Sequence, residues 1–318
     1  MVSLKSGAEL ELTVVLTVVS GKRAVRENLE ALTPQIDFES AEIIVPFDKW
    51  SLDVGSLSSD FPKVHFHLIE DLGLASSYDI SAHEHRLYDR RRAVGLQLSR
   101  GQIVAMIEDN ARPARDWVRQ ILASHEQPYE VIGGAVENGI ERPLNRALYY
   151  CDFGRYGRPF QSGEVSYASD VNLAYKREAL MAIQSVWHGA YHETTVHWTL
   201  QSLGKKIFLD NRPVVYQMRT SLMFRQALIE RVAWGRVFAE TRAGRLSTLR
   251  RFLFAAGSLL LPGPMSARVY KHMKRQGQPN GTIFSTLPVV FVLLIGWSVG
   301  ELLGYVNGEP AAVRRGNK

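Results

Sequence analysis

The sequence predicts an α/β protein with a mostly parallel sheet flanked by helices, followed by a C-terminal helical region that associates with a membrane. Short β-branched apolar runs alternate with helical patterns through the first two thirds of the chain. Beyond residue 220 this alternation gives way to basic and strongly apolar segments. The 318 residues are 46% hydrophobic and 22% charged, a composition that excludes a disordered chain.

The expected strands and helices of the first region follow one another along the chain. Residues 12–19 (LTVVLTVV) form a β-branched run that ends at Ser20-Gly21, which is typical of a buried parallel strand. Further strands are expected at 42–45, 64–68, 103–107 and 131–136, and helices at 24–33, 84–99 and 113–124. Neither GxGxxG nor GxxxxGK[ST] follows the first strand, which argues against a dinucleotide-binding or P-loop protein.

Charge is distributed unevenly along the chain. The net charge is +6, but residues 212–318 hold 16 Lys and Arg and only 4 Asp and Glu. Such a basic block indicates an anionic partner, either nucleic acid or a membrane surface. The single cysteine, Cys151, excludes an intrachain disulfide and indicates a reducing compartment. No apolar segment follows the N-terminal lysine, so no secretory signal peptide is expected.

The C-terminal third combines basic and apolar segments. Residues 222–243 read as an amphipathic helix with four arginines, and 252–261 are apolar but too short to span a bilayer. Residues 287–306 reach the length of a spanning helix, although they include Glu301 and Pro288. We therefore expect a catalytic-type domain at 1–220, a basic amphipathic helix at 221–250 and a membrane-associated region at 251–318. A buried helical subdomain is the alternative.

An acidic motif follows the strand at 103–107. Glu108, Asp109 and Asn110 place two carboxylates and an amide oxygen on one turn. Oxygen donors of this kind can hold a hard divalent cation such as Mg²⁺ or Mn²⁺, and that cation can bridge to a diphosphate. A solvated acidic loop is the alternative. Because ligands bind beyond the carboxyl ends of parallel strands, this motif and Asp48 are expected at the same edge of the sheet.

The order and spacing of these motifs resemble the family 2 glycosyltransferases of the GT-A fold. The matching segments, over about residues 12–245, are Leu12–Val19, Glu42–Asp48, Arg92–Gly101, Ile103–Asn110 with Pro113 and Trp117, 167–178 (YASDVNLAYKRE), and a block from His192-Glu193 to Pro213. The resemblance implies a nucleotide-sugar donor, a divalent cation and transfer with inversion.

The resemblance also implies a role for each matching residue. Glu193 takes the place of the family's catalytic aspartate, a general base that deprotonates the acceptor hydroxyl for in-line attack on the anomeric carbon. Asp48 is expected to contact the nucleotide base or ribose. The full set comprises the donor contacts Thr17, Asp48, Arg92 and Asp109, the metal ligands Glu108, Asp109 and Asn110, and the acceptor contacts Asp170, Asn172 and His192.

The chain departs from the family pattern at three places. Glu-Asp-Asn replaces Asp-x-Asp, which lowers the expected metal affinity, and His192-Glu193 replaces Glu-Asp. Ala93 stands where the family has asparagine after Arg92. The chain has no QxxRW motif, the mark of processive polysaccharide synthases, so transfer of a single sugar is expected.

The preferred hypothesis is a membrane-associated enzyme that moves one sugar from a nucleotide-diphosphate sugar to a lipid-linked or membrane-proximal glycan acceptor. Its catalytic domain is expected in the cytoplasm, in agreement with the positive-inside tendency of the basic C-terminal third. A catalytically degenerate scaffold of the same fold is the main alternative. A nucleic-acid binder using residues 222–275 is disfavoured by the adjacent apolar segments. A nucleotidylyltransferase would carry a glycine-rich basic loop after the first strand, and Ser20–Arg23 resembles such a loop only weakly.

Overall fold

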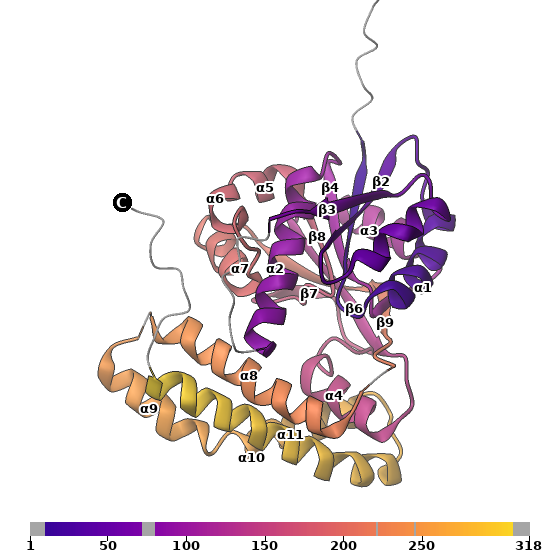
Figure 1. Cartoon of the computed structure of the whole chain (residues 1–318). Helices are drawn as coiled ribbons and strands as arrows, with labels where there is room; N and C mark the ends of the chain where they lie inside the picture. Colours follow the sequence, from indigo (N-terminus) through magenta and orange to yellow (C-terminus); the bar gives the residue numbers. More distant parts are fainter. Residues whose placement is uncertain (1–9, 72–79, 221, 245, 308–318) are drawn as a thin grey trace, which may run out of the picture. The chain divides into compact units, whose positions relative to one another are not determined.

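The computed structural model describes residues 10–71, 80–220, 222–244 and 246–307 (Figure 1). Over this part of the chain nine strands form one sheet in the order β3-β2-β1-β4-β8-β6-β9-β5, with β7 paired to β9. The strands are β1 (Leu12–Thr17), β2 (Ala41–Asp48), β3 (His65–Ile69), β4 (Ile103–Glu108), β5 (Ala111–Pro113), β6 (Val131–Asn138), β7 (Gly163–Val165), β8 (Asn172–Lys176) and β9 (Ile207–Gln217). The prediction of an α/β sheet flanked by helices is confirmed.

The sheet is more mixed than the sequence predicts. Strands β1, β2, β3 and β4 pair in parallel, as expected from their buried apolar runs. Strand β8 lies antiparallel between β4 and β6, and β9 is parallel to β6 but antiparallel to β5 and β7. Composition does not distinguish the two directions for a buried strand, because both faces of such a strand are covered in either case.

Helices and short 3-10 turns flank the sheet (Figure 1). They are α1 (Lys22–Leu32), η1 (Thr33–Gln35), η2 (Leu52–Ser59), α2 (Ile80–Leu98), α3 (Trp117–His125), α5 (Arg177–Met181), α6 (Gln184–Trp187) and α7 (Glu193–Ser202). Helices α2 and α7 contribute Leu96 and Leu200 to a core cluster that includes Val15 and Met106 of the sheet. This packing fixes the two helices against the strands whose ends carry the acidic residues.

Glycine at position 95 lets α2 approach the sheet. A Cβ atom at Gly95 would lie 2.3 Å from the Val15 side chain, so a larger residue would push the helix outward. Arg91 and Arg92 lie one turn earlier on α2 and are 3% and 4% exposed. The close approach therefore brings both guanidinium groups to the ends of the parallel strands.

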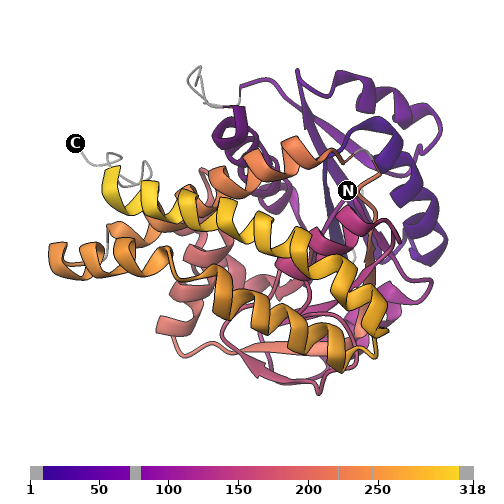
Figure 2. The ribbon, with the colours of Figure 1, turned by 90° about the horizontal axis from the view of Figure 1, so that it is seen from below.

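The chain divides into two compact units. Over the described residues, the sheet unit comprises 10–71, 85–139 and 158–218, and the helical unit comprises 80–84, 140–157, 219–220, 222–244 and 246–307. The helical unit contains α4 (Pro143–Asp152), α8 (Phe224–Ala243), α9 (Thr248–Ser258), α10 (Pro262–Arg275) and α11 (Asn280–Asn307) (Figure 2). It thus includes a segment, 140–157, that the sequence analysis assigned to the first domain. Residues 308–318 of the predicted membrane-associated region lie outside the described residues.

Helix α11 is long and apolar enough to cross a membrane, judged by length and composition alone. Helices α9 and α10 together meet the same criteria but are bent by 63° at the break between them. Within the helical unit, α11 packs against α8, α9, α10 and α4. The apolar C-terminal segment predicted from the sequence is therefore present as a helix with protein neighbours on several sides.

Candidate functional site

The candidate site lies at the carboxyl ends of three parallel strands. Thr17, Asp48 and Glu108 are the last residues of β1, β2 and β4. Thr17 and Glu108 are direct neighbours in the strand register. In an α/β sheet this edge is the usual place for a ligand. The sequence prediction that Asp48 and the acidic motif share one edge of the sheet is therefore confirmed.

Arg92 connects carboxylates from three parts of the chain. Its guanidinium group lies 2.5 Å from Glu108 of β4, 3.0 Å from Asp170 in the loop before β8 and 3.3 Å from Asp89 on its own helix. Burial by itself lowers the pKa of Arg92, but the carboxylates of Asp170, Glu108 and Asp89 outweigh it and raise the pKa above its ordinary value. The arginine is therefore a permanent positive charge in the middle of an acidic group.

Asp89 is the carboxyl whose ionisation this arrangement disfavours. Burial raises its pKa to about 7, and the negative charges of Asp170 and Glu108 add to that rise, whereas Arg92 opposes it. The Asp89 backbone carbonyl also accepts a hydrogen bond of 2.9 Å from the backbone N–H of Tyr191. Near neutral pH, Asp89 therefore exchanges a proton while Arg92 stays charged.

Glu193 is joined to this group through Asp170. It is the first residue of α7, and its carboxylate accepts a hydrogen bond of 3.1 Å from the backbone N–H of Asp170. Negative charge in the first helical turn is stabilised by the helix dipole. Glu108, Arg92, Asp170 and Glu193 thus form a connected group, defined here as the acidic site.

His192 immediately precedes the same helix. Its Nδ1 atom lies 3.2 Å from the Thr195 hydroxyl, and burial lowers the pKa of His192 despite the opposing charge of Asp170. The imidazole is therefore neutral at physiological pH. His192 directly precedes Glu193 in the chain, and its ring interacts with the charge of Asp170. The sequence predicts roles in acceptor chemistry for both of these residues.

Asp109 is hydrogen-bonded to the loop that follows β1. Its carboxylate accepts hydrogen bonds of 2.9–3.0 Å from the backbone N–H groups of Val19, Ser20 and Gly21. Burial raises the pKa of Asp109 to about 6, although these hydrogen bonds oppose the rise. Through these hydrogen bonds Asp109 positions the loop after β1.

Asp48 is likewise occupied by the protein itself. Its side chain is fully buried, with one oxygen 2.8 Å from Nε of Arg91 and the other 2.8 Å from the backbone N–H of Trp50. Arg91 also donates to the Val18 carbonyl and to the Ser51 hydroxyl. Through these contacts Asp48 fixes Arg91 and the ends of β1 and β2.

Asn172 lies in the core of the sheet unit. It is fully buried, and its side-chain oxygen accepts a hydrogen bond of 2.8 Å from the Trp117 indole. Its amide nitrogen donates to the carbonyls of Ala135 and Pro213 at 2.9 and 3.1 Å. With donor and acceptor both satisfied, the side chain joins α3, β6 and β9 and does not reach the acidic site.

Of the three predicted metal donors, Asn110 has an unsatisfied side-chain oxygen, whereas Glu108 is paired with Arg92. Among the described residues there is no group of three His, Cys, Asp or Glu that could hold a metal ion. Asn110 is buried, and its side-chain oxygen has no hydrogen-bond partner within the described structure. Magnesium is commonly held by one or two protein oxygens together with substrate phosphates. Glu108 and Asn110 therefore fit a cation that a bound diphosphate helps to coordinate.

Sequence reasoning missed two positioning residues. The sequence predicts no role for Arg91, whereas in the structure it is buried against Asp48. Asn28 of α1 donates to the backbone carbonyls of Glu108 and Ala111 at 3.1 and 2.9 Å and thereby holds the acidic turn. The available signal was position: Asn28 falls on the same helical face as Val25, Leu29 and Leu32, where a polar residue needs a buried partner.

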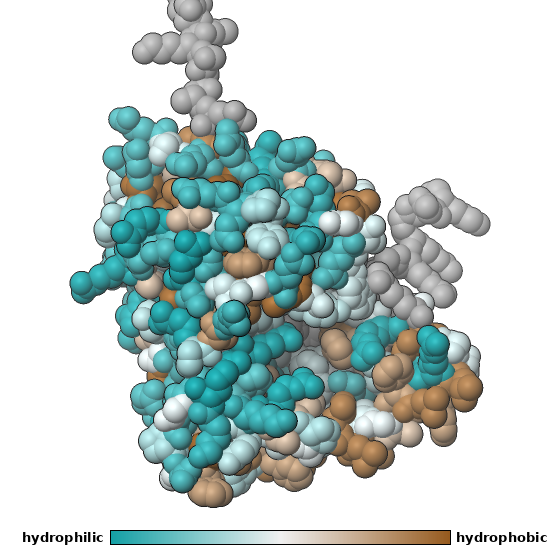
Figure 3. All heavy atoms as spheres, turned by 180° about the vertical axis from the view of Figure 1, so that it is seen from behind, coloured by the Kyte–Doolittle hydropathy of each residue, from teal (hydrophilic) through white to brown (hydrophobic). Residues whose placement is uncertain are grey.

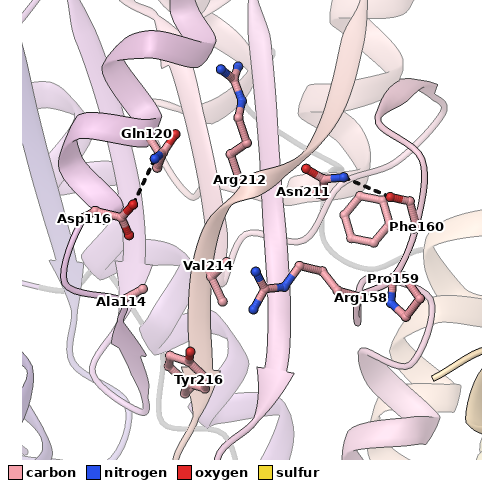
Figure 4. A pocket seen from close by; sticks show the side chains of 10 residues that line it. All are labelled: Ala114, Asp116, Gln120, Arg158, Pro159, Phe160, Asn211, Arg212, Val214 and Tyr216. Carbon is pink, nitrogen blue, oxygen red and sulfur yellow. Dashed lines mark hydrogen bonds between the residues drawn. The ribbon is translucent and has the colours of Figure 1, made fainter. Parts of the chain in front are cut away.

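A hollow of about 570 Å³ lies elsewhere on the sheet unit (Figure 4). It is lined by residues of α3, β9 and the 158–160 segment, and it contains none of the predicted site residues. Its two arginines are each paired, Arg158 with Glu137 and Arg212 with Asp210. The hollow is therefore separate from the acidic site.

The fold is shared with solved glycosyltransferase structures. The mannosyltransferase PcManGT from Pyrobaculum calidifontis, in complex with GDP-Man and Mn²⁺, has a TM-score of 0.53 at 14% identity and covers 92% of this chain and 87% of its own. S. aureus TarS 1–349 with UDP-GlcNAc has a TM-score of 0.48 at 12% identity, covering 88% of this chain and 90% of its own. Glucosyl-3-phosphoglycerate synthase from Mycobacterium tuberculosis, with Mn²⁺, UDP and glucosyl-3-phosphoglycerate, has a TM-score of 0.45 at 16% identity and covers 72% and 78%.

No protein-family model matches the chain, and no curated protein matches it by sequence. At these sequence identities the similarity defines the fold alone. The fold assignment is based on the mannosyltransferase, whose TM-score is 0.53. The chain has a GT-A-like glycosyltransferase fold. Its acidic site lies at the edge of the sheet where α/β proteins bind their ligands.

Proposed function

We propose that this protein is an inverting family 2 glycosyltransferase that transfers a single sugar from a nucleoside diphosphate sugar to a hydroxyl or phosphate of its acceptor. The observation that carries the proposal is the acidic site, a connected group of Glu108, Arg92, Asp170 and Glu193 at the carboxyl edge of a GT-A-like sheet. The complex of the mannosyltransferase with GDP-Man and Mn²⁺ supports a nucleotide-sugar donor and a divalent cation.

In the proposed reaction Glu193 is the general base. Its carboxylate takes the proton of the acceptor hydroxyl, the acceptor oxygen bonds to the anomeric carbon, and the bond to the diphosphate oxygen breaks. Because attack and departure occur on opposite faces, the anomeric configuration inverts. Asp170 and His192 flank the base and are proposed to orient the acceptor, since Asp170 is tied to Glu193 and His192 precedes it.

On the donor side, Arg92 holds Glu108 and Asp170 in register with the strand ends. Thr17 is proposed to contact the donor, because its buried hydroxyl has no hydrogen-bond partner among the described residues. A divalent cation held by Glu108 and Asn110 would offset the negative charge of the leaving nucleoside diphosphate. Asp109, Asp48 and Arg91 act by positioning the loops around this group.

We also propose a lipid-linked or membrane-proximal glycan acceptor, with the sheet unit in the cytoplasm, where activated sugars are available. The support is the helical unit. Within the stretch 247–275 there are six Lys and Arg residues and no Asp or Glu, beside exposed apolar side chains. A basic and apolar surface fits anionic lipid rather than nucleic acid, which lacks an apolar phase to receive such side chains.

The donor site is tested by calorimetric titration of UDP-, GDP- and TDP-sugars with and without Mn²⁺. We expect one nucleotide to bind in a metal-dependent manner and Glu108→Ala to lose that binding. Glu27→Ala is the control, because Glu27 forms an exposed ion pair with Arg23. Binding that needs no metal would exclude the assignment of Glu108 and Asn110 as metal ligands. No binding by any of the donors would overturn the transferase proposal, and binding without any turnover would favour the degenerate scaffold.

A further inference from the structure

Helix α11 is in backbone contact with α8 along its second half. Glycines occur at 296, 300 and 304, so they form one stripe on the helix. A Cβ atom at Gly300 would lie 2.0 Å from the Val232 carbonyl oxygen, and one at Gly304 would lie 2.5 Å from the Arg236 carbonyl oxygen. The stripe therefore lets the two helices approach as closely as their backbones allow.

The partner helix is charged along its whole length. Helix α8 carries four arginines and two glutamates within 20 residues. Arg231 is 1% exposed, forms an ion pair with Asp152 of α4 and lies over the Trp297 ring of α11 at 5.9 Å. Arg236 pairs with Glu240 on the same helix. Of these charges, Arg231 lies beside the apolar helix, against which α8 packs.

A membrane crossing by α11 conflicts with this packing. If α8 entered the bilayer with α11, its charged side chains would enter hydrocarbon, where ionised groups are costly. If α11 entered alone, the glycine stripe would separate from α8 and the Arg231–Asp152 pair would lose its cover. Either route breaks contacts that the folded helical unit makes.

The helical unit instead exposes apolar side chains along the lengths of its helices. One face of α11 presents exposed residues at four-residue spacing, Phe291, Ile295, Val299 and Leu303. Helix α9 exposes Leu249, Phe252 and Leu253 at 59–70%, and Leu260 follows it at 76%. Figure 3 shows hydrophobic residues gathered at the lower right, over the helices of this unit. Arg250, Arg268, Lys271 and Lys274 lie on α9 and α10.

We infer that the helical unit docks onto the surface of an anionic bilayer, with α11 lying in the membrane plane and both of its ends on the same side. The occupant is lipid because the exposed faces combine large apolar side chains with a stretch, 247–275, that has basic residues and no acidic ones. The inference rests on the membrane association proposed above and replaces a spanning helix with an interfacial one.

The orientation of α11 is tested by thiol labelling. The native Cys151 is replaced by Ala, and a single cysteine is introduced either by Gly281→Cys or by Asn307→Cys. Both sites are exposed, and Gly281 has open space around it. The variants are bound to closed vesicles containing phosphatidylglycerol and treated with a membrane-impermeant maleimide. We expect full labelling at both sites, with no increase after detergent is added. An increase at either site after detergent would show a crossing and overturn the inference.

Vesicle flotation tests the docking surface separately. We expect the full chain to float with phosphatidylglycerol vesicles and not with purely neutral ones, and Leu253→Ser/Leu260→Ser to reduce the bound fraction at least tenfold. The control is Leu52→Ser/Leu203→Ser, two leucines on the sheet unit that are 58% and 57% exposed. Equal losses in both pairs, or self-association of the chain without flotation, would overturn the inference. Nucleotide-sugar binding is measured on the same samples, and it tests the proposed function independently of flotation.

Discussion

Each charged residue of the acidic site is explained by its partners. Three carboxylates contact the guanidinium of Arg92, those of Asp89, Glu108 and Asp170. A fourth, from Glu193, is hydrogen-bonded to the backbone of Asp170. A buried charge is tolerated only when it is paired and hydrogen-bonded, so the arginine holds these carboxylates together. A divalent cation bound beside these carboxylates would offset the remaining excess of negative charge.

Replacement of the proposed base separates catalysis from binding. Glu193→Gln keeps an oxygen that can accept the hydrogen bond from the Asp170 backbone N–H but cannot take a proton. We expect hydrolysis of the bound nucleotide sugar, in which water takes the place of the acceptor, to fall by ~10²–10⁴-fold. Donor affinity measured by calorimetry should stay within about twofold.

The control for this replacement is Glu178→Gln, an exposed glutamate in the first turn of α5. It should leave both hydrolysis and affinity unchanged. If Glu193→Gln retained full hydrolysis, another group would be the base. If it instead lost donor binding, its role would lie in the ground state and not in proton transfer.

The raised pKa of Asp89 predicts a pH-dependent stability. Its pKa is about 7 in the fold, chiefly because of burial, and about 3.9 in an unfolded chain. Between these values the folded protein binds the proton more tightly, so this carboxyl lowers the free energy of unfolding as pH rises from about 4 to 7. In Asp89→Asn that loss should be smaller by on the order of 2 kcal/mol, as measured by denaturant unfolding at pH 4.5 and 7.5. Parallel pH curves for the two proteins would contradict the prediction.

Helical elements owe their placement to small residues as much as to apolar ones. Gly95 allows α2 to approach β1, and Gly300 allows α11 to approach α8, with added Cβ atoms at 2.3 and 2.0 Å from their neighbours. In the first case the approach delivers Arg91 and Arg92 to the strand ends. In the second it joins an apolar helix to a charged one, which the composition of neither helix suggests.

Two glycines in α11 provide a matched test of this contact. Gly300→Ala places a methyl group against the Val232 carbonyl and should lower the free energy of unfolding of the helical unit by about 2 kcal/mol. Gly281→Ala, in open space on the same helix, should be neutral or stabilising because alanine favours helix. The measurement is thermal unfolding followed by circular dichroism. Equal tolerance of both changes would exclude the close α8–α11 packing.

At the scale of the whole molecule, sequence patterns located the sheet and the acidic motif but not every partner. The strands at 12–19, 42–45 and 103–107 were predictable because uninterrupted β-branched runs need burial on both faces. The assignment of 140–157 to the helical unit was not, because α4 is held there by contacts with α11 and by the pair between Asp152 and Arg231. Contacts between residues 79 positions apart leave no local pattern in the sequence.

What the sequence determined by itself is the places of β1, β2, β3, β4 and β6 along the chain and the turn of acidic residues after β4, since periodicity and motif spacing are local properties. What only the tertiary structure decided is which of those acids are available. Asp109 and Asp48 resemble ligand residues in the sequence, but backbone N–H groups and Arg91 occupy them in the fold. The same applies to α11: its composition permits a membrane crossing, whereas its packing against a charged helix favours the membrane surface, because the cost of burying a charge depends on what surrounds it.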